Sequence, residues 1–256
     1  MSAVAGSGSV LLRPISTDLK AVADSLTIRD VTDDNELFSE ACNLIVEGYI
    51  GLSSNRLDPL QIRESICFDR YHRLGLARTL LVTGCNPNSG VVESLGTVRL
   101  TLPSRTVERN GLNQIEAMDL MTPLVGWPNF TFRAFDLGHL VEGGRTAVSR
   151  ACRMGAAKEL GVSRVVLATL LREGFQLAAK RYGKTQLWGV LPSYFAGTLS
   201  AIGCEVHRAP GISLNVEKSG LFQKYDRYWL QGNPGFYRVI VPSLAPQQLR
   251  DNEKGH

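Results

Sequence analysis

The sequence predicts a single α+β (mixed α/β) domain, and three observations lead to this prediction. Segments 77–83 and 94–102 have the character of strands and are joined by a stretch rich in turn residues, which is the pattern of a β-hairpin. The second half of the chain reads as a strand, a long helix, a strand, a shorter helix and a strand. Neither internal repeats nor an obvious boundary divides it. We therefore expect one domain over residues 26–242, after a flexible extension at 1–25 and before a tail at 243–256.

Composition narrows the class of protein. Of the 256 residues, 44% are hydrophobic and 20% are charged, which is ordinary for a globular protein with a buried core. No apolar run approaches the ~20 residues of a membrane span, and the N-terminus lacks the pattern of a signal peptide. The five cysteines are scattered and never spaced as C-x-x-C, so neither a disulfide framework nor a zinc site is predicted. We expect a cytoplasmic protein without a membrane segment, a metal or a nucleic-acid partner.

The first elements in chain order are a strand and two helices. Residues 26–31 alternate as a strand does, and Asp33 or Asp34 is placed to cap a helix over 35–46. Gly48 and Gly51 are expected to end this helix. A second helix is predicted after Asp58-Pro59, because proline is favoured in the first turn of a helix.

The remaining elements follow a long excursion at 103–132, which has no clear period and contains several prolines. Ser163 is placed to cap a helix that runs to Tyr182 and is closed by Gly183. After it we expect a strand at 186–191, a helix at 192–202, a strand at 204–208 and a last hairpin formed by 225–230 and 236–241.

The stretch from Phe135 to Arg153 is the predicted centre of the chemistry. It alternates as a strand, but Glu142 to Arg145 places an acid, two glycines and an arginine in succession within it. Strict alternation sends Glu142 and Arg145 to opposite faces. The pair Gly143-Gly144 lies between them, and such pairs often mark a β-bulge, which re-aims the next side chain and opens the sheet. The alternative is that the acid and the arginine form an ion pair at the rim of a sheet without chemistry.

Three short motifs accompany this order of elements. Gly96 to Leu100 (GTVRL) has the form G-x-x-R-L, and Glu142 to Val148 (EGGRTAV) is similar to E-x-S-R-x-x-V. Phe68 to His72 (FDRYH) is similar to F-D-x-F-D, with a histidine where the last aspartate is usual. Together with the elements from Leu26 to Val241, these motifs resemble the GNAT acyltransferase fold, and more narrowly its branch of autoinducer synthases and N-acyl amino acid synthases.

The resemblance implies a fold and an activity. It implies a mostly antiparallel, twisted sheet flanked by helices and bulged or splayed at the central strand. The implied reaction moves an acyl group from a thioester to an amine. The stretch Gly48-Tyr49-Ile50 looks more like the sequence of the relatives that acylate amino acids. The tryptophan and arginine of the lactone-forming synthases have no clear match in residues 44–52. We therefore expect an N-acyl amino acid synthase-like enzyme that transfers a long acyl chain to an amino acid or small amine.

Roles follow for individual residues. Glu142 is the candidate general base that takes a proton from the attacking ammonium, and Arg145 would hold Glu142 or the substrate carboxylate. Arg99 is a second candidate for that carboxylate, with a buried ion pair as the alternative. Asp69 and Tyr49 are further candidates to contact the substrate, and the alternative for Asp69 is that it only caps or tethers the loop. Two aromatic residues, Trp188 and Tyr194, are expected to line an acyl tunnel. Because no histidine adjoins Cys152, we expect direct transfer without an acyl-enzyme.

The donor is expected to arrive on an acyl carrier protein. The phosphate loop common in acetyltransferases is not evident at 150–155, which disfavours a free coenzyme A thioester, although acyl-CoA stays possible as co-substrate. Acyl carrier proteins are acidic and bring the acyl group on a 4′-phosphopantetheine arm. The residues expected to receive the donor are Val148, Arg150, Arg153 and Lys158, within a segment of basic surplus. No permanently bound cofactor is expected.

Three other functions stay open at this point. One is a coenzyme A-dependent N-acetyltransferase of a small amine or a protein, and another is an enzyme like the acyl-homoserine-lactone synthases. The third, of a different class, is a non-catalytic module that binds acyl groups or amino acids on the same scaffold. A binding module does not need a carboxylate at position 142, whereas each of the enzymes does.

Overall fold

A computed structural model describes residues 19–52, 58–102, 121–123, 139–214 and 232–241. Seven of the described strands form the main sheet, and all neighbours among them are antiparallel except β5 and β6. In spatial order they are β1 (Thr27–Asp30), β2 (Ala77–Cys85), β3 (Val92–Thr101), β5 (Leu140–Val148), β6 (Gln186–Leu191), β9 (Gly235–Ile240) and β7 (Glu205–Arg208). A separate pair joins β4 (Met121–Pro123) to β8 (Ile212–Leu214). The predicted α+β fold with a mostly antiparallel sheet is confirmed.

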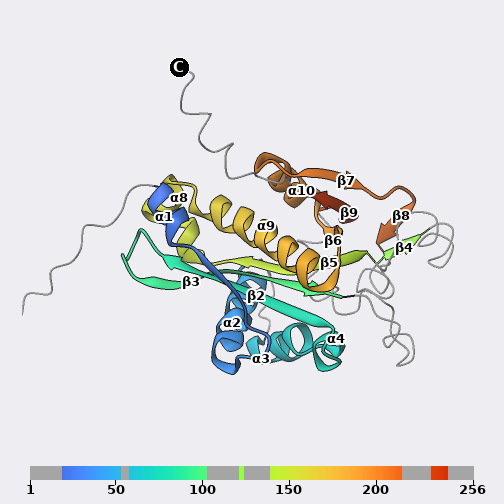
Figure 1. The fold of residues 1–256 in the computed structure, drawn as a ribbon, viewed down its shortest axis with the longest axis horizontal. Helices are drawn as coiled ribbons and strands as arrows, with labels where there is room; N and C mark the ends of the chain where they lie inside the picture. The colour runs from blue at the N-terminus through green and yellow to red at the C-terminus, as the bar shows by residue number, and fades with distance from the viewer. Residues whose placement is uncertain (1–18, 53–57, 103–120, 124–138, 215–231, 242–256) are drawn as a thin grey trace, which may run out of the picture.

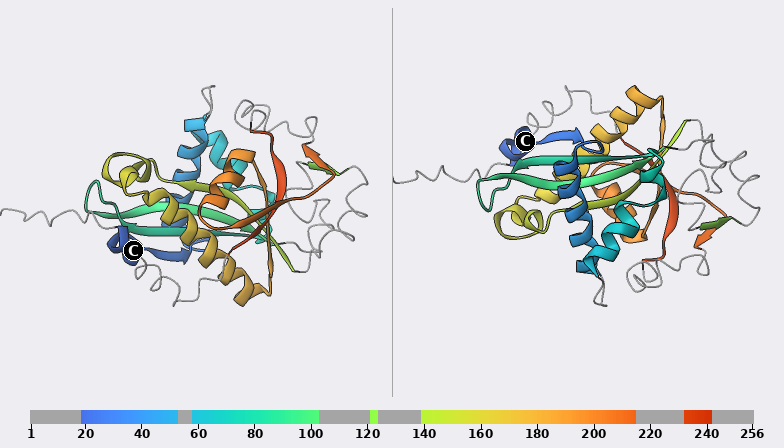
Figure 2. Two further views of the ribbon diagram at one scale, coloured as in Figure 1. Left: turned by 90° about the horizontal axis from the view of Figure 1, so that it is seen from above. Right: turned by 90° about the horizontal axis from the view of Figure 1, so that it is seen from below.

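Helices cover both faces of this sheet (Figures 1 and 2). One face carries α1 (Leu19–Ser25), α8 (Gly155–Glu159) and the long α9 (Val162–Tyr182). The other carries α2 (Asn35–Leu52), α3 (Pro59–Ile62), the π-helical turn η1 (Arg63–Cys67) and α4 (Arg70–Arg73). The 3-10 turn η2 (Arg150–Arg153) precedes α8, and α10 (Ser193–Ala201) follows β6. None of the helices in the described ranges is long and apolar enough to cross a membrane.

The main core lies between α9 and the sheet. Val166, Leu170 and Gly174 of α9 face β2 and β3, where a Cβ atom on Gly96 would come within 2.6 Å of Val166. On the other side, α2 packs against β5, since a Cβ atom on Gly48 would lie 3.5 Å from that of Ala147. Apolar burial on both faces therefore holds the central strands between two helical layers.

The predicted end of the first long helix is wrong. Asp34 caps α2 as expected, because its Oδ1 accepts from the N–H groups of Glu36 and Leu37 at 3.2 and 3.1 Å. The helix nevertheless continues through Gly48 and Gly51 to Leu52. Glycine costs a helix only about 1 kcal/mol relative to alanine, and burial of Ala41, Cys42 and Ile45 of the same helix against the rest of the protein outweighs that cost.

The other predicted elements are present with shifted ends. The hairpin strands run to Cys85 and from Val92, so the turn is shorter than expected, and β5 begins at Leu140. Gly161, with φ of +73°, precedes α9 in place of Ser163, whereas Gly183 ends the helix as predicted. The predicted strand at 225–230 and most of the excursion at 103–132 lie outside the described residues.

We predict that Gly189→Ala destabilises the protein by roughly 1–3 kcal/mol, because the added methyl group would lie 2.7 Å from the backbone oxygen of Gly143. The control is Gly197→Ala in α10, where nothing lies within 4 Å and alanine suits a helix better. Urea unfolding of both variants measures the difference. Equal stability of the two variants would contradict a tight crossing of β5 and β6 at Gly189.

Candidate active site

The sheet opens between its two central strands. β5 and β6 are paired only at Leu140↔Gln186, Val141↔Leu187 and Glu142↔Trp188. Beyond this point β5 continues to Val148 paired with β3, while β6 continues to Leu191 paired with β9. Among the described strands, β5 is therefore not paired with β6 after Glu142, and the sheet opens along this edge. The predicted splay at the central strand is confirmed.

A β-bulge brings the predicted acid and arginine to one face. Arg99 is paired with Gly144, but Thr97 is paired with Ala147, so β5 has one extra residue at Arg145–Thr146. Arg145 has φ of +50°, a left-handed conformation that is uncommon for residues other than glycine. The bulge thus lies just after the predicted glycine pair. Its consequence is the expected one, since the side chain of Arg145 lies on the α2 face.

Asp69 connects two arginines on this face. Its Oδ2 lies 2.7 Å from Nη1 of Arg99 and 3.9 Å from Nη2 of Arg145. Arg99 also donates from Nη1 to the carbonyl of Ile66 at 3.0 Å, and Arg145 donates from Nη1 to the hydroxyl of Tyr49 at 3.3 Å. Elements far apart in sequence thus meet at one carboxylate.

Local chain geometry explains the position of Asp69. Asp69 is the N-cap of α4, and its Oδ1 accepts from the N–H of His72 at 3.0 Å. Because η1 ends at Cys67, the carbonyl of Ile66 belongs to the last turn, where carbonyl groups lack partners within the helix. Arg99 supplies that partner. The side chain expected to cap or to contact substrate therefore caps α4 and holds arginines.

The charged side chains around Asp69 are buried, so the balance between their positive and negative charges is important. Arg99 is 2% exposed and Glu142 is 4% exposed, and Glu142 is paired in register with Thr101 beside Arg99. Burial and the neighbouring Arg145 lower the pKa of Arg99, despite the opposing effects of Asp69 and Glu142. For Arg145, burial also lowers the pKa, but Tyr49, Asp69 and Glu142 outweigh it and the net pKa is raised. Two guanidinium groups are thus offset by two carboxylates.

The side chains of the two arginines differ in their exposure to solvent. The side chain of Arg145 is 14% exposed, whereas that of Arg99 is 2% exposed and is held by Asp69 and Ile66. The buried ion pair that was the alternative for Arg99 is what the structure contains. Of the two, Arg145 is therefore the better placed to meet a ligand.

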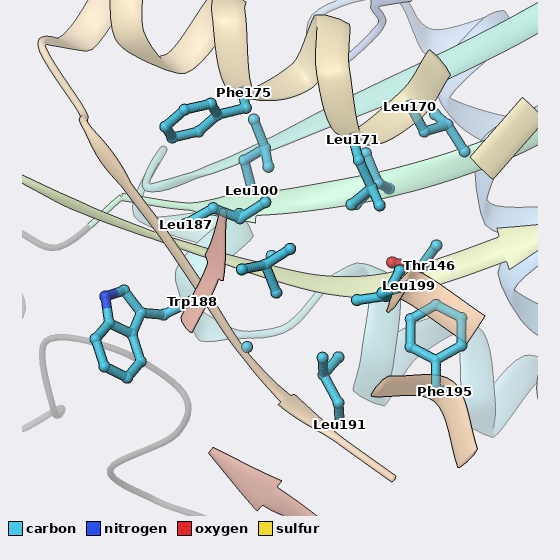
Figure 3. Close-up of a pocket in the computed structure, with 14 residues that line it drawn as sticks. Leu100, Thr146, Leu170, Leu171, Phe175, Leu187, Trp188, Leu191, Phe195 and Leu199 are labelled. Atoms are coloured by element: carbon cyan, nitrogen blue, oxygen red, sulfur yellow. The ribbon is translucent and has the colours of Figure 1, made fainter. Parts of the chain in front are cut away.

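A narrow apolar pocket lies on the opposite face, at the start of the opening (Figure 3). Its volume of about 20 Å³ has room for about one water molecule. Leucine side chains from the sheet and α9 dominate it, and Figure 3 shows the indole of Trp188 turned away from them. The lining residues are Val98, Leu100, Gly143, Thr146, Leu170, Leu171, Phe175, Leu187, Trp188, Gly189, Leu191, Phe195, Leu199 and Val239.

The lining includes one of the two aromatic residues that the sequence predicts along an acyl tunnel. Trp188 is among the lining residues, although its indole is turned away from the leucines, whereas Tyr194 is 44% exposed and is not among them. The residue after Tyr194, Phe195, does line the pocket. Thr146 and Phe175 were also missed. The bulge that turns Thr146 to this face had a glycine pair as its signal, but Phe175 had none.

The expected donor-binding residues lie at the other end of β5. Val148 ends this strand and packs against the main core. Arg150 and Arg153 in η2 and Lys158 in α8 are exposed. These three cations are thus separated from Glu142 by the length of β5.

The described residues give little support to covalent catalysis by Cys152 or to chemistry at a metal ion. Burial raises the pKa of Cys152 to about 12, with Glu93 adding to the effect, so this thiol is protonated at neutral pH and is a poor nucleophile. No group of three or more histidine, cysteine, aspartate or glutamate side chains in the described part of the chain is arranged to hold a metal ion.

Comparison with known proteins gives matches of fold at low sequence identity. No protein-family profile and no curated protein matches the chain. The AHL synthase LasI is 13% identical with a TM-score of 0.46, over 85% of this chain and 89% of LasI. FeeM, an N-acyl amino acid synthase from uncultured soil microbes, is 13% identical with a TM-score of 0.41, over 84% of this chain and 90% of FeeM. BjaI, a CoA-dependent acyl-homoserine lactone synthase, is 13% identical with a TM-score of 0.46, over 89% of this chain and 88% of BjaI.

We predict that His72 makes the protein less stable in mild acid. Its ring stacks on Phe38 at 4.7 Å, and burial lowers its pKa, an effect that the nearby Asp69 opposes and Arg99 reinforces. A lowered pKa in the folded state means that the unfolded chain binds the proton more tightly. Stability is therefore complete above the ordinary histidine pKa of about 6.5 and falls as the pH drops from there through the lowered value.

Chemical unfolding between pH 7.5 and 5 measures this effect, and His72→Phe should flatten that part of the profile. The control is His207→Gln, because His207 is 55% exposed and pairs with the exposed Glu205. An acid profile of His72→Phe that matches that of the unsubstituted protein would show that His72 is not responsible.

Proposed function

We propose that this protein is an N-acyltransferase that moves an acyl group from a thioester to the amine of an amino acid. The observation that carries the proposal is the position of Glu142. This buried carboxylate lies at the last paired position of β5 and β6, where the sheet begins to open. A cluster with two arginines lies on its face of the sheet, and an apolar pocket lies on the other.

The proposed reaction is direct transfer. The acceptor ammonium loses a proton to Glu142, either directly or through one water molecule. The free amine then attacks the thioester carbonyl and a C–N bond forms. As the C–S bond breaks, the nitrogen loses its second proton, and the leaving thiolate takes this proton up. Backbone N–H groups along the edge of β5 beyond Glu142 are candidates to stabilise the oxyanion of the intermediate.

We assign the acceptor carboxylate to Arg145. Its guanidinium group is the more accessible of the two, and a guanidinium binds a carboxylate through two parallel hydrogen bonds. Tyr49 lies 3.3 Å from Arg145 and would be a further contact for the acceptor. Arg99 and Asp69 then serve to hold Arg145 in place.

We assign the acyl chain to the apolar pocket. Thr146 and Gly143 connect the pocket to the open edge of β5, and the other lining side chains are almost all apolar. With about 20 Å³ of free volume, the pocket accepts a chain only if side chains such as Phe175 or Phe195 move aside. A long acyl chain thus requires repacking between α9 and α10.

We favour an acyl carrier protein over acyl-CoA as the donor. The exposed cations Arg150, Arg153 and Lys158 provide a surface complementary to an acidic protein. The sequence at 150–155 lacks the glycine-rich loop that commonly holds a pyrophosphate. All five cysteines are free thiols, which suits a cytoplasmic enzyme.

Glu142→Gln tests the reaction. If Glu142 is the general base, kcat per folded molecule falls by roughly 10²–10⁴-fold, because glutamine keeps the size and hydrogen bonding of the side chain but cannot take the proton. Mass spectrometry of the N-acyl amino acid formed from an acyl carrier donor measures the rate. The exposed Glu47 gives the control variant Glu47→Gln.

An ion pair without chemistry gives the opposite pattern. Loss of a buried charge partner beside two arginines then destabilises the fold by about 3–5 kcal/mol, with an unchanged rate per folded molecule. That result would remove Glu142 from the mechanism.

A second prediction concerns the donor. Reversing the charges of Arg150, Arg153 and Lys158 to glutamate is expected to slow association with an acidic acyl carrier protein and to flatten its dependence on salt, because the attraction between opposite charges is lost. Stopped-flow association at several salt concentrations measures this change. If the charge-reversed protein binds the carrier as the parent does, and acyl-CoA is an equally good donor, the carrier assignment is wrong.

A further inference from the structure

Asn88, in the turn between β2 and β3, connects this hairpin to the basic segment that follows β5. Its Nδ2 donates to the carbonyl groups of Ala151 at 2.8 Å and Met154 at 3.1 Å. Its Oδ1 accepts from the N–H of Ala157 at 3.2 Å. One amide group therefore contacts both η2 and α8. The local sequence around Asn88 does not indicate this role, because its partners lie more than sixty residues away.

The segment that Asn88 contacts is anchored to the main core by Cys152 and Ala157, but its helix is short and lacks a side-chain cap of its own. α8 has five residues, and its N-cap residue Met154 makes no side-chain capping bond. A helix this short is not stable by itself and depends on outside contacts. Gly155 has φ of +51°, and a Cβ atom there would lie 2.7 Å from Oδ1 of Asn88, so the close approach requires a glycine.

The turn that presents Asn88 is itself well ordered by hydrogen bonds. The buried Asn86 accepts at its Oδ1 from the N–H of Asn88 at 2.9 Å, and its carbonyl accepts from the N–H of Gly90 at 2.7 Å. These bonds do not involve the side chain of Asn88. Replacing that side chain thus removes the connection to η2 and α8 while leaving the turn in place.

We propose that Asn88 is a positioning residue for donor docking. It holds η2 and α8 in the arrangement in which Arg150, Arg153 and Lys158 meet an acidic carrier protein. The inference rests on the carrier docking proposed above, and it adds a residue that does not itself touch the donor. Asn88 is also remote from Glu142, which is paired with Thr101 at the opposite end of β3.

The test is Asn88→Ala assayed with two donors. With an acyl carrier protein, KM for the donor should rise about three- to tenfold at unchanged kcat, the effect of having to order a loosened segment upon binding. With a carrier-free acyl-pantetheine thioester, both constants should stay at the parent values. Ser89→Ala is the matched control, because Ser89 belongs to the same turn and its hydroxyl contacts only Val91 among the described residues.

A second readout does not depend on activity. The amide hydrogen of Ala157 should exchange faster with solvent in Asn88→Ala than in Ser89→Ala, because the substitution removes its acceptor. Unchanged exchange would overturn the proposed connection. A fall in kcat, or an equal rise in KM for both donors, would show a general structural effect and would also overturn it.

The failure of this inference can be told apart from that of carrier docking itself. Arg153→Glu is measured beside Asn88→Ala by titration with the acyl carrier protein. Weaker binding in Arg153→Glu alone would refute the role of Asn88 and leave docking at this surface intact. Unchanged binding in both variants would refute docking at this surface, and the role of Asn88 with it.

Discussion

The carboxylate of Asp69 is the interaction on which the candidate site depends. It lies 2.7 Å from Arg99 on β3 and 3.9 Å from Arg145 on β5, while its other oxygen caps α4. Arginine side chains this deeply buried need a nearby negative charge, because removing a cation from water without a partner costs several kcal/mol. Asp69 thereby fixes the α2 layer against the central strands at the point where the sheet opens.

The bulge at Arg145 makes this arrangement possible. In a regular strand Arg145 and Glu142 would face opposite ways, and only one of them would reach the α2 face. The left-handed conformation of Arg145 costs roughly 1–2 kcal/mol in a residue other than glycine. Its contacts with Asp69 and Tyr49 offset that cost. Backbone strain and ion pairing are therefore linked within one residue.

The opening of the sheet depends on the same strand. Among the described strands, β6 is the only parallel neighbour of β5, and their three paired positions end at Glu142. Gly189 passes next to the carbonyl of Gly143, where any side chain would push the strands apart. Beyond it, β6 keeps its hydrogen bonds to β9 and β5 keeps those to β3. Each strand retains one partner, so the sheet can open without leaving both edges unpaired.

The sequence by itself determined the α+β class, the β2–β3 hairpin, the helix that ends at Gly183 and a bulge beside Gly143-Gly144, since each depends on neighbours in the chain. Only the tertiary structure decided that α2 continues past Gly48, that Arg99 is held by Asp69 and Ile66, and that Asn88 joins the hairpin to α8. The physical reason is that packing and burial act between segments distant in sequence. Such contacts can outweigh a local preference of about 1 kcal/mol, and a local pattern does not contain them.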